Sequence, residues 1–395
     1  MSGPLSHIRV LDMSRIMAGP WAGQILADLG ADVIKVERKG AGDDTRAWGP
    51  PNLTASDGTA TAESAYYLSV NRGKRSIEVD LSDEDDRAVV RALAARSDIL
   101  LENFRVGTLA RFGLGPDDLA RINPGLIYCS ITGFGLDGPR KDQVAYDFMI
   151  QAMGGLMSVT GGPDGAPGGG PQKVGVPIVD IMTGMYATIG CLAALARRSE
   201  TGEGELVDVA MLDVSVAMLS NQAMNAIVSG KTPVRRGNRH PNIQPQDVFA
   251  TADGHIAVAV GNDEQFRRFA QALGQGEWAD DPRFATNVER VKNLETLHPM
   301  ISALLAAHPL AHWLDVLGKG SVPHGPIRTV PEVFEDPQVK HRGMVQTHQH
   351  PLAGDLRLVG SPVRMRNAPL VPGRAPPLLG EHSDEIRAEL GEGKA

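Results

Sequence analysis

Residues 8–37, IRVLDMSRIMAGPWAGQILADLGADVIKVE, contain the pattern that decides the fold. Two short apolar runs, residues 8–11 and 32–37, lie on either side of a segment with helical spacing, residues 21–29. A strand, a helix and a second strand in this order predict a βαβ unit with parallel strands. Strands this short and apolar are typical of a sheet with helices on both faces.

The same alternation continues through the first third of the chain. Further strands are expected at residues 76–81, 99–102 and 126–132, with a helix at 83–96. These elements predict an α/β fold with a Rossmann-like large domain and a mostly parallel sheet. No expected strand is followed by Gly-x-Gly-x-x-Gly, so the sequence gives no support for NAD binding.

A different pattern begins near residue 248 and predicts a smaller α+β domain. Two strands are expected there, followed by three helices, at residues 248–251, 255–260, 263–273, 288–307 and 309–317. The final segment has short strands and proline-rich turns that make a poor independent core, so we expect it to rejoin the large domain. The predicted division is a large domain of residues 1–215 with 328–395, a small domain of 225–325, and linkers at 216–224 and 326–327.

Composition limits the possible partners and compartments. The chain has 395 residues, 39 Lys and Arg against 47 Asp and Glu, and a net charge of −8, so neither nucleic acid nor a membrane surface is an expected partner. The longest nearly uncharged run, residues 181–196, is shorter than the roughly 20 residues that span a bilayer. Cys129 and Cys191 lie in apolar runs and are expected as buried thiols. With no export signal in the first residues, we expect a cytoplasmic protein.

Several short motifs fail on inspection. Gly230-Lys231-Thr232 lacks the earlier glycine of a phosphate-binding loop, because Asn225 stands in its place. His348 and His350 have no third ligand at a plausible spacing, so we expect a solvated strand edge and no metal site. There is also no Gly-x-Ser-x-Gly elbow of a serine hydrolase.

Asp180 is the carboxylate with the most informative position. It follows an expected strand at residues 176–179 and precedes an expected helix at 181–198. It is either the N-cap of that helix or a nucleophile at the carboxyl edge of the sheet, where α/β proteins bind ligands. Position alone leaves both interpretations open.

A series of longer segments resembles the class III CoA-transferases, the family of formyl-CoA transferase and carnitine CoA-transferase. The resemblance runs from about Ile8 to Leu390 and includes YYLSVNRGKRSIEVDL, ILLENFRVGTLARFGLG, YCSITGFGLDGP, AYDFMIQAMGG, VGVPIVDIMTGMYA and RAPPLLGEHSDEI. GDDTRAWGPP and VFATADGHIAVAVGNDEQF most resemble the succinyl-CoA:glutarate branch, which acts on dicarboxylic acids.

The resemblance implies that Asp180 is the nucleophile and that CoA moves through aspartyl anhydride and aspartyl-CoA thioester intermediates. It implies no permanently bound cofactor, since coenzyme A and acyl-CoA are substrates. Met17, Tyr146 and Asp147 are expected to order the site. The CoA-binding residues it implies are Ile16, Arg38, Lys74, Arg75, Asn103, Phe104, Arg111 and Tyr146, and Phe112 is a further aromatic residue that could pack on CoA. For Arg111, a surface helix charge is the alternative.

Substrate and assembly are further expectations. Arg235, Arg236, Arg239 and His240 form a basic cluster that could hold the distal carboxylate of a dicarboxylic acid, or instead grip CoA phosphates or a partner chain. The glycine-rich loop at 161–170 and the segment 240–244 are candidate lids. The resemblance also implies a homodimer with interlocked chains.

Two other functions stay open. The same family contains α-methylacyl-CoA racemases, whose catalytic histidine is replaced here by Tyr146, and tyrosine, with an ordinary pKa near 10, is a poor base. A non-catalytic CoA-binding protein is the other alternative. The finding that Asp180 does not react with acyl-CoA would favour this non-catalytic alternative.

Overall fold

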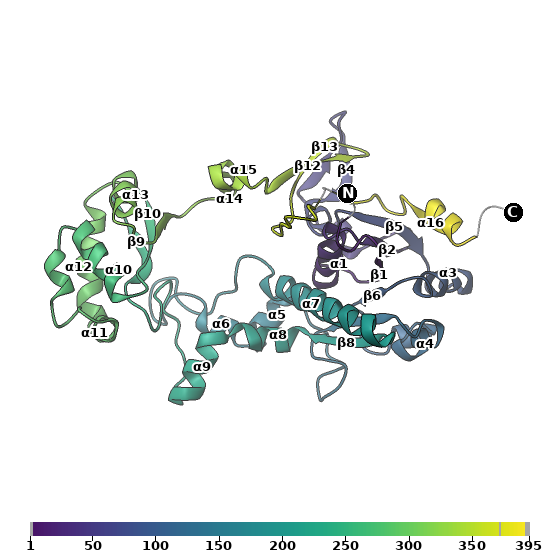
Figure 1. The fold of residues 1–395 in the computed structure, drawn as a ribbon, viewed down its shortest axis with the longest axis horizontal. Helices are drawn as coiled ribbons and strands as arrows, with labels where there is room; N and C mark the ends of the chain where they lie inside the picture. The colour runs from purple at the N-terminus through teal and green to yellow at the C-terminus, as the bar shows by residue number, and fades with distance from the viewer. Residues whose placement is uncertain (1–2, 371–372, 392–395) are drawn as a thin grey trace. The chain divides into compact units, whose positions relative to one another are not determined.

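The structure is a computed structural model that describes residues 3–370 and 373–391 (Figure 1). The chain divides into two compact units. The first contains the chain up to Leu156, Val174–Met224 and the chain from Pro337 onward, and the second contains Met157–Lys173 and Asn225–Asp336. This division groups residues 157–173 and 328–336 with the second unit, whereas the sequence-based boundaries place them in the large domain.

The first unit is built on a six-stranded parallel sheet with the order β5-β2-β1-β6-β7-β8. Its strands are β1 (Arg9–Asp12), β2 (Asp32–Arg38), β5 (Lys74–Val79), β6 (Ile99–Glu102), β7 (Ile127–Thr132) and β8 (Glu205–Ala210). The chain starts in the middle, runs to one edge, and then returns to build the other half, as in Rossmann folds. The predicted α/β class with a large parallel sheet is confirmed, and β8 is a strand that the sequence analysis missed.

Helices cover both faces of this sheet. On one face, α1 (Ala18–Asp28) and α7 (Ile178–Thr201) enclose an apolar core that includes Leu26 and Ala187. On the other face, the core includes Leu93, Leu119 and Ile386, which come from α3 (Glu84–Ala94), α4 (Pro116–Ile122) and α16 (Ser383–Glu389). Cys129 and Cys191 are free and buried in the first of these cores, as predicted.

Helix α7 differs from its expectation in two ways. It begins at Ile178 with Pro177 as N-cap, so residues 178–179 belong to the helix and the expected strand 176–179 is wrong. It also has 24 residues, which makes it, within the described chain, the one unbroken helix long and apolar enough to cross a membrane. Its apolar residues Ala187, Cys191 and Ala194 pack into the sheet core, which accounts for that composition.

Smaller elements complete the first unit. The strand pairs are β3 (Asn52–Thr54) with β4 (Ala60–Ser64) and β12 (Val345–His350) with β13 (Gly354–Val359), both antiparallel. The short helices are α2 (Ala65–Leu68), α5 (Asp147–Met153), α8 (Met211–Met218) and α15 (Pro337–His341), together with 3-10 turns at Asp44–Ala47 and Leu109–Phe112. Along the chain, helices α6 (Leu156–Val159) and α9 (Ser220–Ser229) each contain a point where one unit ends and the other begins.

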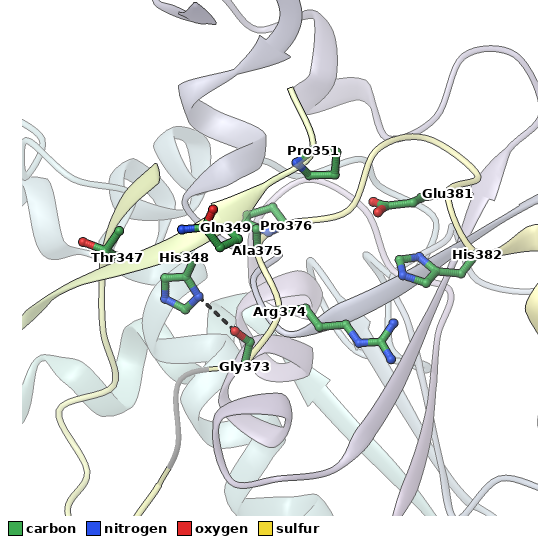
Figure 2. Close-up of a pocket in the computed structure, with 10 residues that line it drawn as sticks. All are labelled: Thr347, His348, Gln349, Pro351, Gly373, Arg374, Ala375, Pro376, Glu381 and His382. Atoms are coloured by element: carbon green, nitrogen blue, oxygen red, sulfur yellow. Dashed lines mark hydrogen bonds between the residues drawn. The ribbon is translucent and has the colours of Figure 1, made fainter. Parts of the chain in front are cut away.

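His348 and His350 do not lie on a solvated edge, as the sequence analysis expected. Both side chains are almost fully buried, with exposed fractions of 4% and 3%. Figure 2 shows the Nδ1 atom of His348 pointing at the Gly373 carbonyl oxygen, 3.0 Å away, beside a pocket of about 450 Å³. The described residues contain no group of three or more His, Cys, Asp and Glu side chains that could hold a metal ion.

The second unit has a three-stranded antiparallel sheet with the order β11-β10-β9. These strands are β9 (Gln246–Ala250), β10 (His255–Ala259) and β11 (His324–Pro326), and the helices are α10 (Asp263–Ala272), α11 (Asn287–Lys292), α12 (Leu294–Ala306), α13 (Leu310–Lys319) and α14 (Val330–Glu335), with a 3-10 turn at Gly276–Ala279. Phe249, Phe266 and Phe269 are central to its core. The helix expected at 288–307 is broken at Asn293, and β11 was not predicted.

Candidate active site

A cleft of about 270 Å³ lies in the first unit where the strand order of the parallel sheet reverses, between β1 and β6. Its walls come from the carboxyl ends of strands and the segments that follow them: residues 15–18 after β1, 103–106 after β6, and 131–133 at the end of β7. The segment 141–146, Asp180 and Met211 complete it. The carboxyl ends of parallel strands at such a reversal are the usual ligand-binding position of α/β sheets.

Among the residues that the sequence analysis singled out, the cleft brings together Asp180, Ile16, Met17, Asn103, Phe104 and Tyr146. Met17 is buried, whereas Tyr146 is half exposed. These residues come from four separate stretches of the chain. The tertiary structure therefore supplies a common site for residues that the family resemblance had only named one by one.

Asp180 is the third residue of α7, and its side chain is half-buried at the cleft. Its carboxyl group has no hydrogen-bond or ion-pair partner among the described residues. Burial, followed by the negative charge of Asp147, raises the pKa of Asp180 to about 7. A carboxyl group with a strongly raised pKa in a cleft is typical of a functional site.

Asp147, on α5, supplies the cap that α7 lacks. The N-cap residue, Pro177, makes no side-chain hydrogen bond. Instead, the backbone N–H groups of Val179 and Asp180 donate to Oδ2 of Asp147, at 2.8 and 3.2 Å. An anion at this position satisfies unpaired N–H groups and is favoured by the helix dipole. The N-cap interpretation of Asp180 is thus wrong, because the capping carboxylate is Asp147.

Ile16 has an unusual backbone conformation at the wall of the cleft. Its φ is +73°, a left-handed value that strains a β-branched residue. Its N–H group donates to the carboxylate of Asp43, 3.3 Å from each oxygen. Asp43 in turn accepts from Nζ of Lys35 at 2.8 Å, with both side chains fully buried. Burial opposes ionisation of Asp43, but Lys35 and hydrogen bonds from Thr45 lower its pKa to about 2.

Asn103 and Phe104 contact Arg15 in the loop that follows β1. The Asn103 side chain accepts from the Arg15 N–H at 2.9 Å and donates to the Arg15 carbonyl at 2.7 Å. The Arg15 guanidinium lies over the Phe104 ring, 5.1 Å from its centroid. The amide of Asn103 thus fixes the loop after β1. Arg15 was missed by the sequence analysis, although its position directly after a strand was a usable signal.

Lys74 and Arg75, which the family resemblance assigns to CoA binding, are not among the residues that line the cleft, and that role stays a prediction. Lys74 is fully buried, and its Nζ donates to Asp12, Pro20 and Asn71 at 2.8–2.9 Å. Arg75 is paired with carboxylates of Asp32, Glu385 and Glu389. Both stand at the start of β5, so their charges are neutralised inside the protein.

Three other expected CoA-binding residues also lie outside the lining of the cleft. Arg38 is exposed at the end of β2, 4.0 Å from Asp44. Arg111 is exposed on a 3-10 turn, and Phe112 packs against the apolar core. The cations that do line the cleft are Arg15, Arg105 and Lys141.

The basic cluster expected at the substrate belongs to the second unit. Arg235 pairs with Asp164, and Arg239 lies 3.4 Å from both Asp247 and Glu295. His240 is half-buried, which lowers its pKa. Arg236 is exposed and makes no ion pair with any described residue. The cluster is therefore largely neutralised by its own neighbours.

Tyr66 is a residue near Asp180 that the sequence analysis missed. Burial and the charges of Asp180 and Asp147 raise the pKa of its phenol to about 12, which places the ring within electrostatic reach of both carboxyl groups. Trp48 lies edge-on to this ring, with centroids 5.0 Å apart. No spacing in the sequence marks either aromatic residue as part of a site.

Comparisons with known proteins agree with this geometry. Residues 5–383 match CoA-transferase family III. The chain is 47% identical to succinate–glutarate CoA-transferase from Agrobacterium fabrum, covering 98% of this chain and 96% of the relative. It is 41% identical to human succinyl-CoA:glutarate CoA-transferase, covering 98% and 86%. The crystal structure of a CAIB/BAIF family protein from Brucella suis has 46% identity and a TM-score of 0.87, covering 99% of this chain and 100% of that one.

The chain belongs to CoA-transferase family III and is a CoA-transferase. The resemblance seen in the sequence is therefore confirmed, including its closeness to the succinyl-CoA:glutarate enzymes.

The raised pKa of Asp180 predicts how the folded state responds to pH. Because the folded state disfavours the ionised carboxyl, wild-type stability falls as pH rises from about 4 to about 7, and Asp180→Asn removes this loss. We expect the unfolding free energy of the variant, relative to that of the wild type, to rise by about 1–2 kcal/mol from pH 4.5 to pH 8.5. This value allows for the half-exposed Asp180 side chain. Thermal unfolding at both pH values measures this. Exposed Asp137 provides the Asp137→Asn control, and an equal difference at both pH values would contradict the prediction.

Proposed function

We propose that this enzyme transfers CoA from succinyl-CoA to a dicarboxylic acid of the glutarate type, with Asp180 as the covalent nucleophile. The observation that carries the chemistry is the unpaired, half-buried Asp180 carboxyl at the cleft between β1 and β6. The donor and acceptor rest on the names of the relatives, which act on succinyl-CoA and glutarate.

In the proposed reaction, the Asp180 carboxylate attacks the thioester carbonyl of the donor, and CoA leaves as a thiolate with an acyl-aspartyl anhydride as product. The thiolate then attacks the aspartyl carbonyl, which releases succinate and forms an aspartyl-CoA thioester. The acceptor carboxylate displaces the thiolate to form a second anhydride. Attack of the thiolate on the acceptor's carbonyl gives the new acyl-CoA and restores Asp180.

Each step replaces one activated acyl group by another, so the sequence conserves activation and requires no ATP or permanent cofactor. The anhydrides must be kept from water. Arg105 and Lys141 line the cleft, make no ion pair among the described residues, and provide positive charge suited to the phosphates of CoA. Arg15 also lines the cleft but pairs with Asp44 at 3.0 Å. Ile16, Asn103, Phe104 and Tyr146 would form the rest of the CoA-binding surface.

The ion pairs of the basic cluster indicate which of its residues is available to bind the substrate. Arg235 and Arg239 face carboxylates of their own unit, whereas Arg236 makes no ion pair among the described residues. We assign Arg236, with His240 as a neighbour, to the distal carboxylate of the acceptor. The racemase alternative is disfavoured because Tyr146, a phenol, stands where its catalytic histidine would be.

We also propose a cytoplasmic homodimer with interlocked chains, as the family resemblance implies. Large apolar side chains are exposed on the first unit, at α5 and α7, and include Phe148, Met149, Met185, Tyr186 and Ile189. Exposed apolar patches of this kind are typical of interaction surfaces. The two free, buried cysteines suit a reducing compartment.

The nucleophile is tested by Asp180→Ala and Asp180→Asn, which we expect to retain the fold and lose CoA transfer. Loss of a covalent nucleophile should lower turnover by more than about a hundredfold. Incubation of the wild type with succinyl-CoA, followed by hydroxylamine trapping and mass spectrometry, should modify the peptide that contains Asp180. Asp142→Asn changes another carboxylate of the cleft and should keep most of the activity. Turnover by Asp180→Asn above about a hundredth of wild type would rule out the covalent route.

The substrate is tested by a panel of acyl-CoA donors against mono- and dicarboxylic acids, with CoA esters followed by mass spectrometry. We expect succinyl-CoA and glutarate-like acids to react fastest. Arg236→Gln should raise KM for dicarboxylates roughly tenfold, since a charge-assisted hydrogen bond is lost, and leave monocarboxylates unchanged. If carnitine or formate outruns every dicarboxylate, the substrate assignment is wrong. Solvent exchange of the α-proton of a 2-methylacyl-CoA without CoA transfer would favour a racemase instead.

The assembly is tested by sedimentation equilibrium of the wild-type protein. We expect twice the chain mass over the accessible concentration range, because interlocked chains cannot separate without unfolding. A monomer mass that does not change with concentration would contradict the dimer.

A further inference from the structure

Gln151 is a fully buried side chain on α5, one helical turn after Asp147. Its two polar ends have different partners. Nε2 donates to Oδ1 of Asp147 at 2.6 Å, and Oε1 accepts from the N–H of Val174 at 2.9 Å. A buried amide is costly unless it is hydrogen-bonded, so this pairing fixes the orientation of the Gln151 side chain.

The position of Gln151 connects three parts of the chain, two of which, Val174 and the start of α7, lie close together in the sequence. One is α5 itself, the second is Val174, and the third is the first turn of α7, reached through Asp147. Val174 is the residue at which the chain returns to the first unit after residues 157–173. The hydrogen bonds of Gln151 therefore tie the incoming end of that segment to the element that caps α7.

The two carboxylate oxygens of Asp147 have separate roles. Oδ2 accepts from the N–H groups of Val179 and Asp180, while Gln151 is the donor to Oδ1 among the described residues. The N–H···Oδ2 hydrogen bond of Asp180 involves the same residue whose side chain faces the cleft. A shift of the Asp147 carboxylate would thus move the backbone of Asp180.

We propose that Gln151 is a positioning residue for Asp180, which it holds in place through the carboxylate of Asp147. The catalytic meaning of this role rests on the proposed function of Asp180 as nucleophile. Gln151 itself is fully buried and does not line the cleft. A misplacement of about 1 Å in a reacting group can lower turnover about a hundredfold. If loss of the Gln151 amide lets Asp147 and Asp180 shift by a similar amount, turnover should fall measurably.

The charge of Asp147 also affects the titration of Asp180. Asp147 and Tyr66 are the titratable groups within electrostatic reach of Asp180, and the charge of Asp147 is one of the two causes that raise the pKa of Asp180. The amide of Gln151 donates to Oδ1 of Asp147 and thereby holds the Asp147 side chain at the start of α7. Loss of the amide should therefore change the titration of Asp180 as well as its position.

The first test replaces Gln151 with methionine, which is similar in size and has no hydrogen-bonding amide. We expect Gln151→Met to lower kcat roughly 10–100-fold, with KM for acyl-CoA changed less than about threefold. NMR titration of the Asp180 side-chain carboxyl, assigned with Asp180→Asn, should give a pKa below the wild-type value because Asp147 is no longer held close. This readout does not require CoA transfer.

The second variant, Gln151→Glu, separates positioning from packing. When the introduced carboxylic acid is protonated, its O–H can donate to Oδ1 of Asp147 in place of the amide N–H, so the activity of the variant relative to the wild type at the same pH should be higher at acidic pH than at alkaline pH. Ionisation of the introduced group beside Asp147 creates two adjacent negative charges and should lower that relative activity. The pH profile of kcat should therefore gain a decrease at alkaline pH that the wild type lacks.

Gln24→Met is the matched control. Gln24 is equally buried on α1, and its amide pairs with backbone atoms of Ser69 and Arg72, outside the cleft. It should lose stability but keep the wild-type kcat and Asp180 titration. If Gln151→Met, like Gln24→Met, keeps both the wild-type kcat and the wild-type Asp180 titration, the proposal is overturned. If Asp180→Asn keeps CoA transfer, the proposed function of Asp180 fails, while an altered Asp180 titration in Gln151→Met would still support the positioning role.

Discussion

Two buried lysines hold the carboxyl edge of the parallel sheet in place. Lys35, on β2, pairs with Asp43 at 2.8 Å and also donates to the Ser14 carbonyl, and Lys74, on β5, pairs with Asp12 at 2.8 Å. All four charged side chains are fully buried or nearly so. Removing one partner of such a pair leaves a buried charge uncompensated, at a cost of about 3–5 kcal/mol. These pairs fix the loop that follows β1, and they allow the left-handed conformation of Ile16 to persist.

Three buried carboxylates, at the end of β1, on β2 and after β2, have an environment opposite to that of Asp180. Asp12, Glu37 and Asp43 are buried, which alone would raise their pKa values, but neighbouring Lys and Arg side chains lower them below the ordinary range. Asp180 has no cationic partner, so burial and the charge of Asp147 raise its pKa to about 7. Paired carboxylates stabilise the fold, whereas an unpaired carboxyl at the cleft is available for chemistry.

The basic residues at the start of β5 form ion pairs within the first unit and do not line the cleft. The segment NRGKRS carries three cations, yet Arg72 pairs with Asp28, Lys74 with Asp12, and Arg75 with several acidic side chains. These cations are structural. The cations that line the cleft are Arg15, Arg105 and Lys141, on the segments that follow β1, β6 and β7, and of these Arg15 pairs with Asp44 at 3.0 Å. These three residues lie where the strand order of the sheet reverses, the usual ligand-binding position of α/β sheets.

The sequence by itself determined the βαβ alternation, the parallel sheet and the family, because strand and helix periodicity are local and the motifs span nearly the whole chain. It also singled out Asp180. Tertiary structure decided which carboxylate caps α7, because Pro177 offers no capping side chain and Asp147 reaches the site from another helix. It also decided that Lys74 is buried while Arg15 faces the cleft. The identity of a charged residue does not show whether it is buried or lines a cleft, because that environment is set by contacts between segments distant in the sequence.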